Sequence, residues 1–303
     1  MEPISLALRF ALYLDLGLLF GMPFFALYSF KKNELAEGFA KHLTSVSLVF
    51  ACSGVVLSLF SLIDTAKNMS GVSSWAEVNT DTLGMLLYGT AFGAAWIVRV
   101  AALCVAALLA WLRPRGQPGI ALLCLVACIA LLTVAWSGHA VMDDGLRRYL
   151  HLSSDFAHLL AAATWLGALV SFVMQIEAKN LASPSEIERL KRTVSGFAPI
   201  GAMIVSVLLV SGAINYLFIV GVKWPNHLYG ELLLVKLFLF SLMLLLAAAN
   251  RFRLGPLLEN ASWGEVSITT ISHLRKSLRM EASIAFLVLA VVSSLGVQSP
   301  FGS

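Results

Sequence analysis

The chain has 303 residues, of which 59% are hydrophobic and only 13% are charged, and its formal net charge is +4. Soluble domains carry about 25% charged residues, so the composition excludes an ordinary soluble protein, and the small net charge does not indicate a nucleic-acid-binding protein. The sequence predicts a polytopic membrane protein that forms one integral-membrane domain over residues 1–303.

Eight apolar stretches are long enough to cross a bilayer, whose core of about 30 Å needs about 20 residues of helix. This count predicts an all-α bundle of eight transmembrane helices. No basic residue precedes the first stretch, so we expect it to remain as a helix rather than be cleaved as a signal peptide. In chain order the stretches are Ile4–Phe30, His42–Ile63, Thr82–Trp111, Pro118–Gly138, His151–Ile176, Val194–Val222, Tyr229–Arg251 and Met280–Val297.

Two segments beside the membrane are also expected to be helical. Ser183 to Glu186 has the pattern of a capping box, with Pro184 at the first helical position. It opens a basic amphipathic helix before the sixth span, and Pro199 should kink that span. The segment Glu265–Leu278 mixes apolar and basic residues, so we expect it to lie along the membrane interface before the eighth span.

Lysine and arginine are distributed unequally between the two sets of loops. The loops after the first, third, fifth and seventh spans, with their flanks, hold fourteen, and the alternate loops hold four. Because basic loops remain in the cytoplasm, we expect both termini in the periplasm and the protein in a bacterial inner (plasma) membrane.

The junction of the fourth and fifth spans carries the strongest candidate site. At 100° per residue, His151, Asp155 and His158 share one helical face, and His139 and Met142 lie in the loop just before it. Imidazole is a ligand for copper, zinc and haem iron, and thioether sulfur is a soft ligand. Asp155 is expected either to bind a metal or to orient an imidazole. The structural alternative is that the histidines bond to lipid headgroups or loop carbonyls.

Polar and sulfur side chains inside the spans form a second set of candidates, for a transport path or for structural pairing. A charge inside a membrane is costly unless it is paired or hydrated. Cys124 and Cys128 share one helical face, which fits either apolar packing or a path for a soft metal. The four cysteines of the chain do not form a disulfide pattern. The set comprises Asp15, Asn215, Glu231, Lys236, Cys124 and Cys128.

Several motifs occur in a fixed order: Gly138-His139-Ala140, the stretch from His151 through Asp155 and His158 to Leu169, Ser211-Gly212 with Asn215, Tyr229–Lys236, Ala249–Phe252 with Pro256, and Glu281. Their order and spacing resemble the CopD/PcoD copper-resistance membrane proteins, most densely over residues 136–258. In that family the first helix often carries a histidine soon after an Arg-aromatic pair. Here Arg9-Phe10 is followed by Ala11–Leu14, so the resemblance implies that this inner ligand is either lost or replaced by Asp15.

The resemblance implies an inner-membrane protein of copper homeostasis that receives copper from a CopC-like periplasmic carrier. We therefore expect a copper-ion permease, not an enzyme, that docks copper on His139, His151 and His158, assisted by Asp155 and Met142. No Walker A motif is present, so an ATP-driven pump is excluded.

Two alternatives remain open at this point. One is a membrane haem b protein that transfers electrons, with two histidines as axial ligands. A second histidine pair for that role is found only in His42 and His273, both at helix edges. The other alternative is a copper-sensing partner that does not transport.

Overall fold

The computed structural model describes residues 3–32, 34, 38–113, 116–138, 143–177, 183–225, 227–259 and 268–298. All regular structure in these residues is helical, and eight of the helices are long and apolar enough to cross a membrane, which confirms the predicted all-α polytopic fold. The elements are α1 (Pro3–Ser29), α3 (Gly38–Ser70), η1 (Trp75–Glu77), α4 (Thr80–Gly89), α5 (Ala91–Trp111), α6 (Gly116–Leu132), η2 (Thr133–Ser137), α7 (Gly145–Gln175), α8 (Pro184–Ile219), α9 (His227–Ala249), the π-helical turn η5 (Asn250–Leu254), α10 (Gly255–Glu259) and α11 (Ile268–Leu295).

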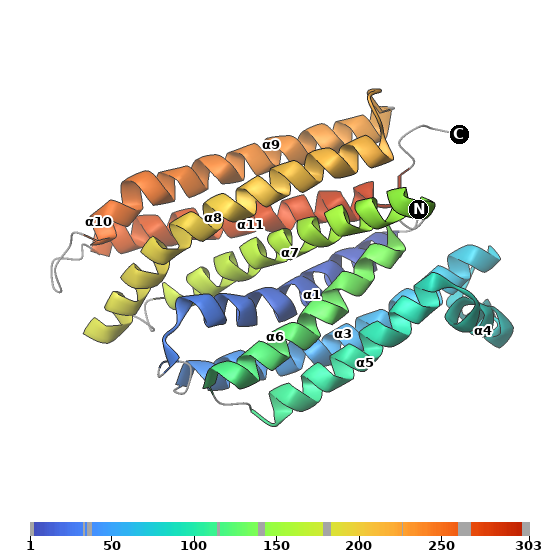
Figure 1. Cartoon of the computed structure of the whole chain (residues 1–303), viewed down its shortest axis with the longest axis horizontal. Coiled ribbons are helices and arrows are strands. Elements are labelled where there is room, and N and C mark those ends of the chain that lie inside the picture. Colours follow the sequence, from blue (N-terminus) through green and yellow to red (C-terminus); the bar gives the residue numbers. More distant parts are fainter. Residues whose placement is uncertain are drawn as a thin grey trace.

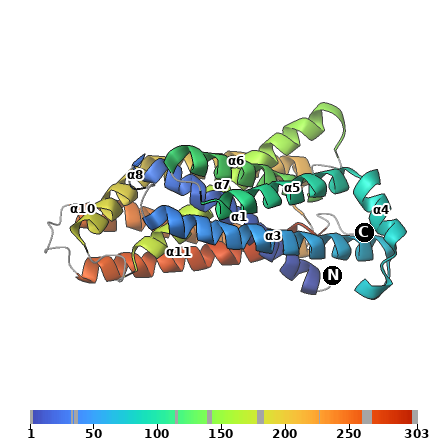
Figure 2. The ribbon, with the colours of Figure 1, turned by 90° about the horizontal axis from the view of Figure 1, so that it is seen from below.

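The long helices run side by side along the long axis of the molecule (Figure 1). α1 begins and α11 ends at the same end of the bundle, which we call the terminal end, and α10 lies at the opposite end, which we call the α10 end (Figures 1 and 2). Arg9 of α1 donates a hydrogen bond of 3.0 Å to the carbonyl of Gly296, just after α11. Both ends of the chain therefore meet at one side of the bundle, as an even number of spans requires.

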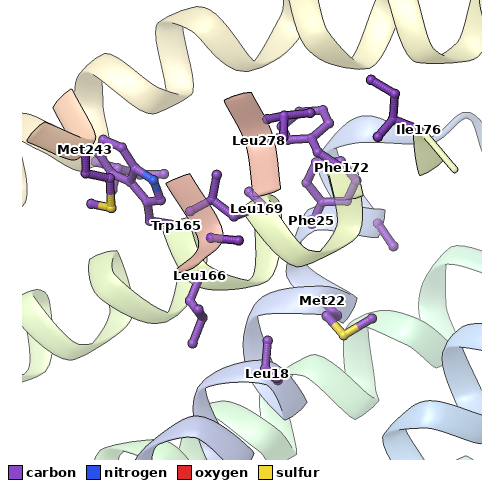
Figure 3. Packing of buried hydrophobic residues seen from close by; sticks show 14 of the residues in the cluster. Leu18, Met22, Phe25, Trp165, Leu166, Leu169, Phe172, Ile176, Met243 and Leu278 are labelled. Carbon is purple, nitrogen blue, oxygen red and sulfur yellow. The ribbon is translucent and has the colours of Figure 1, made fainter. Parts of the chain in front are cut away.

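α1 is the central helix, because it packs against α3, α6 and α7 and contributes to two hydrophobic clusters. The larger cluster joins α1 to α7, α8, α9 and α11 through side chains such as Phe25, Trp165 and Leu169 (Figure 3). The second joins α1 to α3, α5 and α6. Outward-facing positions carry exposed apolar side chains, for example Phe238 at 68% exposure, as expected of helices that contact lipid.

The closest approach between α1 and α7 occurs at two glycines. A Cβ atom at Gly167 would lie 2.2 Å from the carbonyl carbon of Gly21, and one at Gly21 would lie 2.1 Å from the carbonyl oxygen of Ala163. Small residues let helix backbones approach in this way, which matters inside a membrane because lipid removes the hydrophobic drive for helix association. This crossing fixes α7, the helix that carries the predicted site, against the centre of the bundle.

The single helix predicted over Thr82–Trp111 is wrong, because the chain breaks between α4 and α5 at Thr90. Thr90 has extended backbone angles, φ −129° and ψ 152°. Its hydroxyl donates to the carbonyl of Leu86 at 2.6 Å and accepts from the N–H of Gly93 at 3.0 Å. The side chain thus caps α5, and only α5 has the length of a span.

The two helices predicted beside the membrane are instead continuous with spans. The capping box at Ser183 is present, but it opens α8, which runs without a break through Pro199 to Ile219. The predicted interfacial segment is the first part of α11 from residue 268 onward, and its first three residues lie outside the described residues. A helix needs apolar residues only inside the bilayer, so hydropathy marks the membrane part of α8 and α11 and misses their polar extensions.

Candidate functional site

The predicted site lies in the first half of α7, at the terminal end of the bundle. His139 and Met142 fall outside the described residues, but the residues on both sides of their segment are described. On the preceding side, the guanidinium of Arg9 donates to the carbonyl of Ser137 at 3.1 Å. The same side chain bonds to Gly296, so Arg9 ties the segment before His139 to both ends of the chain.

His151 is buried and is held by a carboxylate. Its Nδ1 lies 2.7 Å from Oδ2 of Asp143, and its ring stacks on Phe218 with 4.9 Å between the ring centroids. Since a carboxylate accepts hydrogen bonds, Nδ1 carries the proton in the neutral ring and Nε2 has the free lone pair. This Nε2 is buried and has no hydrogen-bond partner among the described residues.

His158 is oriented by a hydroxyl group of α8. Its Nδ1 lies 2.9 Å from Oγ of Ser211, and Oγ itself donates to the carbonyl of Val207 at 2.5 Å. Because the single hydroxyl proton is already used, Ser211 accepts from Nδ1–H, and Nε2 of His158 is the unprotonated nitrogen. These contacts therefore assign the same tautomer to both histidines.

Asp155 lies on α7 between the two histidines. Its Oδ1 accepts a 2.7 Å hydrogen bond from the amide of Asn215, and a Cβ atom at Gly138 would lie 3.9 Å from its Oδ2. Lys236 of α9 lies within electrostatic range of Asp155 and of His158. The carboxylate is thus surrounded by three elements, α8, α9 and the end of η2.

The arrangement does not bring all these side chains around one point. His151 and His158 are seven residues apart on one helix, which separates them by about 10 Å along its axis. Within the part of the chain that the structure describes, no three histidine, cysteine, aspartate or glutamate side chains lie close enough to hold a metal ion. α7 therefore presents two separate imidazoles with Asp155 between them.

The second set of candidates is dispersed through the bundle. Asp15 is buried, accepts a 2.5 Å hydrogen bond from Ser53 of α3, and its Oδ2 has no partner among the described residues. Glu231 is exposed in the first turn of α9. Cys124 is buried in the cluster between α1, α3, α5 and α6, and Cys128 packs against that cluster, which places both thiols in an apolar core.

The interior also holds Arg99, which was not found from the sequence, and Glu281, which was noted only among the motifs that carry the resemblance. Arg99 of α5 is 1% exposed, and it donates to the hydroxyl of Thr133 at 2.8 Å and to its carbonyl at 3.3 Å. A lone arginine in an otherwise apolar span was the signal that could have shown it. Toward the α10 end, the buried carboxyl of Glu281 accepts from the indole of Trp165 at 3.2 Å and from the amide of Asn250 at 3.0 Å.

Known families cover most of the chain. The N-terminal domain of copper resistance protein D-like proteins matches residues 1–149, and copper resistance protein D matches residues 191–295. Copper resistance protein D of Pseudomonas syringae pv. tomato is 39% identical over 99% of this chain and 97% of its own length. The chain belongs to the copper resistance protein D family.

Two other relatives extend the range of the copper resistance protein D family. Inner membrane protein YebZ of Escherichia coli (strain K12) is 29% identical over 98% of both chains. Copper transport protein CutJ of Bacillus subtilis (strain 168) is 30% identical over 82% of this chain, which spans about half of that relative, 46% of its length. No solved structure matches. With the eight apolar helices, these relatives confirm a multi-pass inner-membrane protein.

Proposed function

We propose that this protein is a copper-ion permease whose first ligands are imidazoles of α7. The observation that carries the proposal is the contact made by each ring: Asp143 and Ser211 lie within hydrogen-bond distance of the Nδ1 atoms of His151 and His158. With Nδ1 as the donor in both contacts, the lone pair of each neutral ring is assigned to Nε2. Metal-binding histidines characteristically give their other ring N–H to a carboxylate or similar acceptor, which fixes the tautomer and the ring orientation.

Copper would pass between successive ligands along α7 rather than bind at a single coordination site. The separation of about 10 Å between the two imidazoles makes them successive positions, and Asp155 lies between them to stabilise the positive charge. His139 and Met142 belong to the same proposal, because His139 directly follows Gly138, which lies beside Asp155. We propose that they complete the outer position, with copper received from a CopC-like periplasmic carrier and passed toward the cytoplasm between α6, α7, α8 and α9.

Copper binding by purified variants tests the ligands. His151→Ala and His158→Ala should each lower copper affinity, whereas His42→Ala, which removes an exposed imidazole at the start of α3, should not. Ser211→Ala should weaken binding by about 10- to 100-fold, because an orienting partner is lost while the ligand remains. The matched control is Ser206→Ala on the same helix, whose hydroxyl bonds only to its own helix. Equal affinity of the Ser211 and Ser206 variants would reject the orienting role.

Transport needs a separate measurement. Proteoliposomes containing the wild type should accumulate copper, and the His158→Ala protein should not. Intact binding without flux would instead support the sensing alternative. The absorption spectrum of the same preparation tests the haem alternative, because bis-histidine haem would give a Soret band.

The direction depends on which end faces the periplasm. The excess of lysine and arginine in the loops at the α10 end supports a cytoplasmic position for that end. In a cysteine-free background, a cysteine at Lys223 should react with a membrane-impermeant reagent from the periplasm, and a cysteine at Ser185 should not. The opposite labelling pattern would reverse the proposed direction of entry.

A further inference from the structure

An open pocket of about 250 Å³ lies at the α10 end, between α11 and the continuous path from α9 into η5. Its lining divides into two parts. One part is polar and basic, and the other is apolar and formed by residues that lie one to two turns further into the membrane part of α9 and α11. The basic part comprises Arg253, His273 and Lys276, and the apolar part includes Leu246, Ala249 and Met280.

The basic side chains of this pocket have no protein partner among the residues that the structure describes. Arg253, His273 and Lys276 are exposed, and none of them makes a hydrogen bond or ion pair within the described ranges of the chain. The other two cations of this part of α11 behave differently. Arg275 donates to the carbonyl of Ile176 at 2.9 Å, and Arg279 pairs with Glu177 at 2.6 Å. α11 therefore uses two arginines to hold the end of α7 and leaves the opposite, basic face open to the pocket.

We infer that this pocket binds an anionic phospholipid. The phosphate of the headgroup would be placed among Arg253, His273 and Lys276, and one acyl chain would follow the apolar part between α9 and α11. Basic pockets between transmembrane helices bind anionic headgroups in this way. A soluble anion would use the basic part alone, whereas the two-part lining matches the two chemical parts of a lipid.

The position of the pocket indicates what the lipid would do. α9 is the least enclosed of the spans, because only 6% of its most apolar stretch is buried in the bundle. It packs mainly against α11. The lipid would bridge these two helices beside the π-helical turn, where Asn250 bonds to Glu281 of α11. Binding should therefore stabilise the protein against heat.

The test uses detergent-purified, delipidated protein titrated with phosphatidylglycerol, or with phosphatidylcholine of the same acyl chains, and read by native mass spectrometry and thermal unfolding. The double variant Arg253→Gln/Lys276→Gln should fold normally, because both side chains are exposed and neither bonds to another described residue. It should bind phosphatidylglycerol about 30-fold more weakly than the wild type, from a factor of about five for each charge. Phosphatidylcholine should bind weakly to both proteins.

A charge-matched control separates a built site from general attraction. Lys32→Gln/Arg113→Gln removes two exposed cations at the same end of the bundle, away from the pocket. This control should retain phosphatidylglycerol. Equal loss in the two double variants would overturn the inference, because binding would then depend on net charge alone. A stabilisation by inorganic phosphate equal to that by phosphatidylglycerol would also overturn it, since a soluble anion would then be the ligand.

Discussion

Adding one methyl group at Gly167 should destabilise the protein, because α1 and α7 cross there backbone to backbone. The new Cβ atom would lie 2.2 Å from the carbonyl carbon and 2.4 Å from the Cα of Gly21, whereas carbon atoms pack at about 3.5–4.0 Å. The two helices would have to separate by about 1 Å, which forfeits a quarter to a half of the dispersion energy of the atoms at the contact. Overpacking costs about 1–3 kcal/mol, and a backbone contact cannot be relieved by a rotamer change, so we expect about 3 kcal/mol for Gly167→Ala.

Thermal unfolding in detergent, followed by tryptophan fluorescence, measures this loss. A cost of about 3 kcal/mol should lower Tm by about 5 °C in a chain of this size. Gly196→Ala is the matched control, because Gly196 is also helical but a Cβ atom there meets nothing within 4 Å. Alanine is the better helix former by about 1 kcal/mol, so the control should keep or raise Tm. Equal Tm values for the Gly167 variant and the wild type would refute the close crossing.

Three further outcomes are expected. Asn250→Leu removes a donor from the buried carboxyl of Glu281 and should cost about 1–3 kcal/mol of unfolding free energy; an unchanged Tm would show that this hydrogen bond does not contribute. Burial raises the pKa of Glu34, but the Lys31 N–H and the Arg192 guanidinium outweigh this effect and leave that pKa below its usual value. Arg192→Gln should therefore lower stability by less than about 1 kcal/mol at neutral pH. This deficit should be complete above the unfolded pKa of about 4.3 and disappear as the pH falls through the lower folded pKa, so a deficit that persists in stronger acid would contradict the pairing. Apparent copper affinity should fall as the pH is lowered, because protons compete with copper for the imidazole nitrogens; a flat profile would favour thioether ligands.

Hydropathy was sufficient to predict the number of spans and the helical class, because a helix is the structure that satisfies its own backbone inside lipid. It was insufficient for the ends of the helices. α3 continues to Ser70 and α8 begins at Pro184, both beyond their apolar parts. The break at Thr90 depends on one hydroxyl that caps the following helix, and apolar periodicity carries no signal for such a cap.

The sequence was sufficient to predict that polar residues inside the bundle would be paired, but not which residue each of them would meet. Asp15 was expected to be paired because a deep carboxyl is costly in a membrane, and Ser53 of α3 is the residue that meets it. Glu281 has two partners, Asn250, which is 31 residues away in the sequence, and Trp165, which is 116 residues away. Nothing in a single sequence relates such separations, because helix packing alone decides which faces meet.

The same distinction explains how much of the candidate site could be predicted. The helical period places His151, Asp155 and His158 on one face, but it cannot tell which ring nitrogen is available to a metal. That choice is made by groups outside this helical face, since Asp143 lies before α7 and Ser211 belongs to α8. The two groups differ in chemistry, yet each accepts a hydrogen bond from Nδ1–H, which assigns the lone pair of the ring to Nε2. The histidines of α7 become a candidate metal path only through these two contacts. For this reason Ser211→Ala tests the proposal more directly than removal of an imidazole, which would lower copper affinity whatever held the ring.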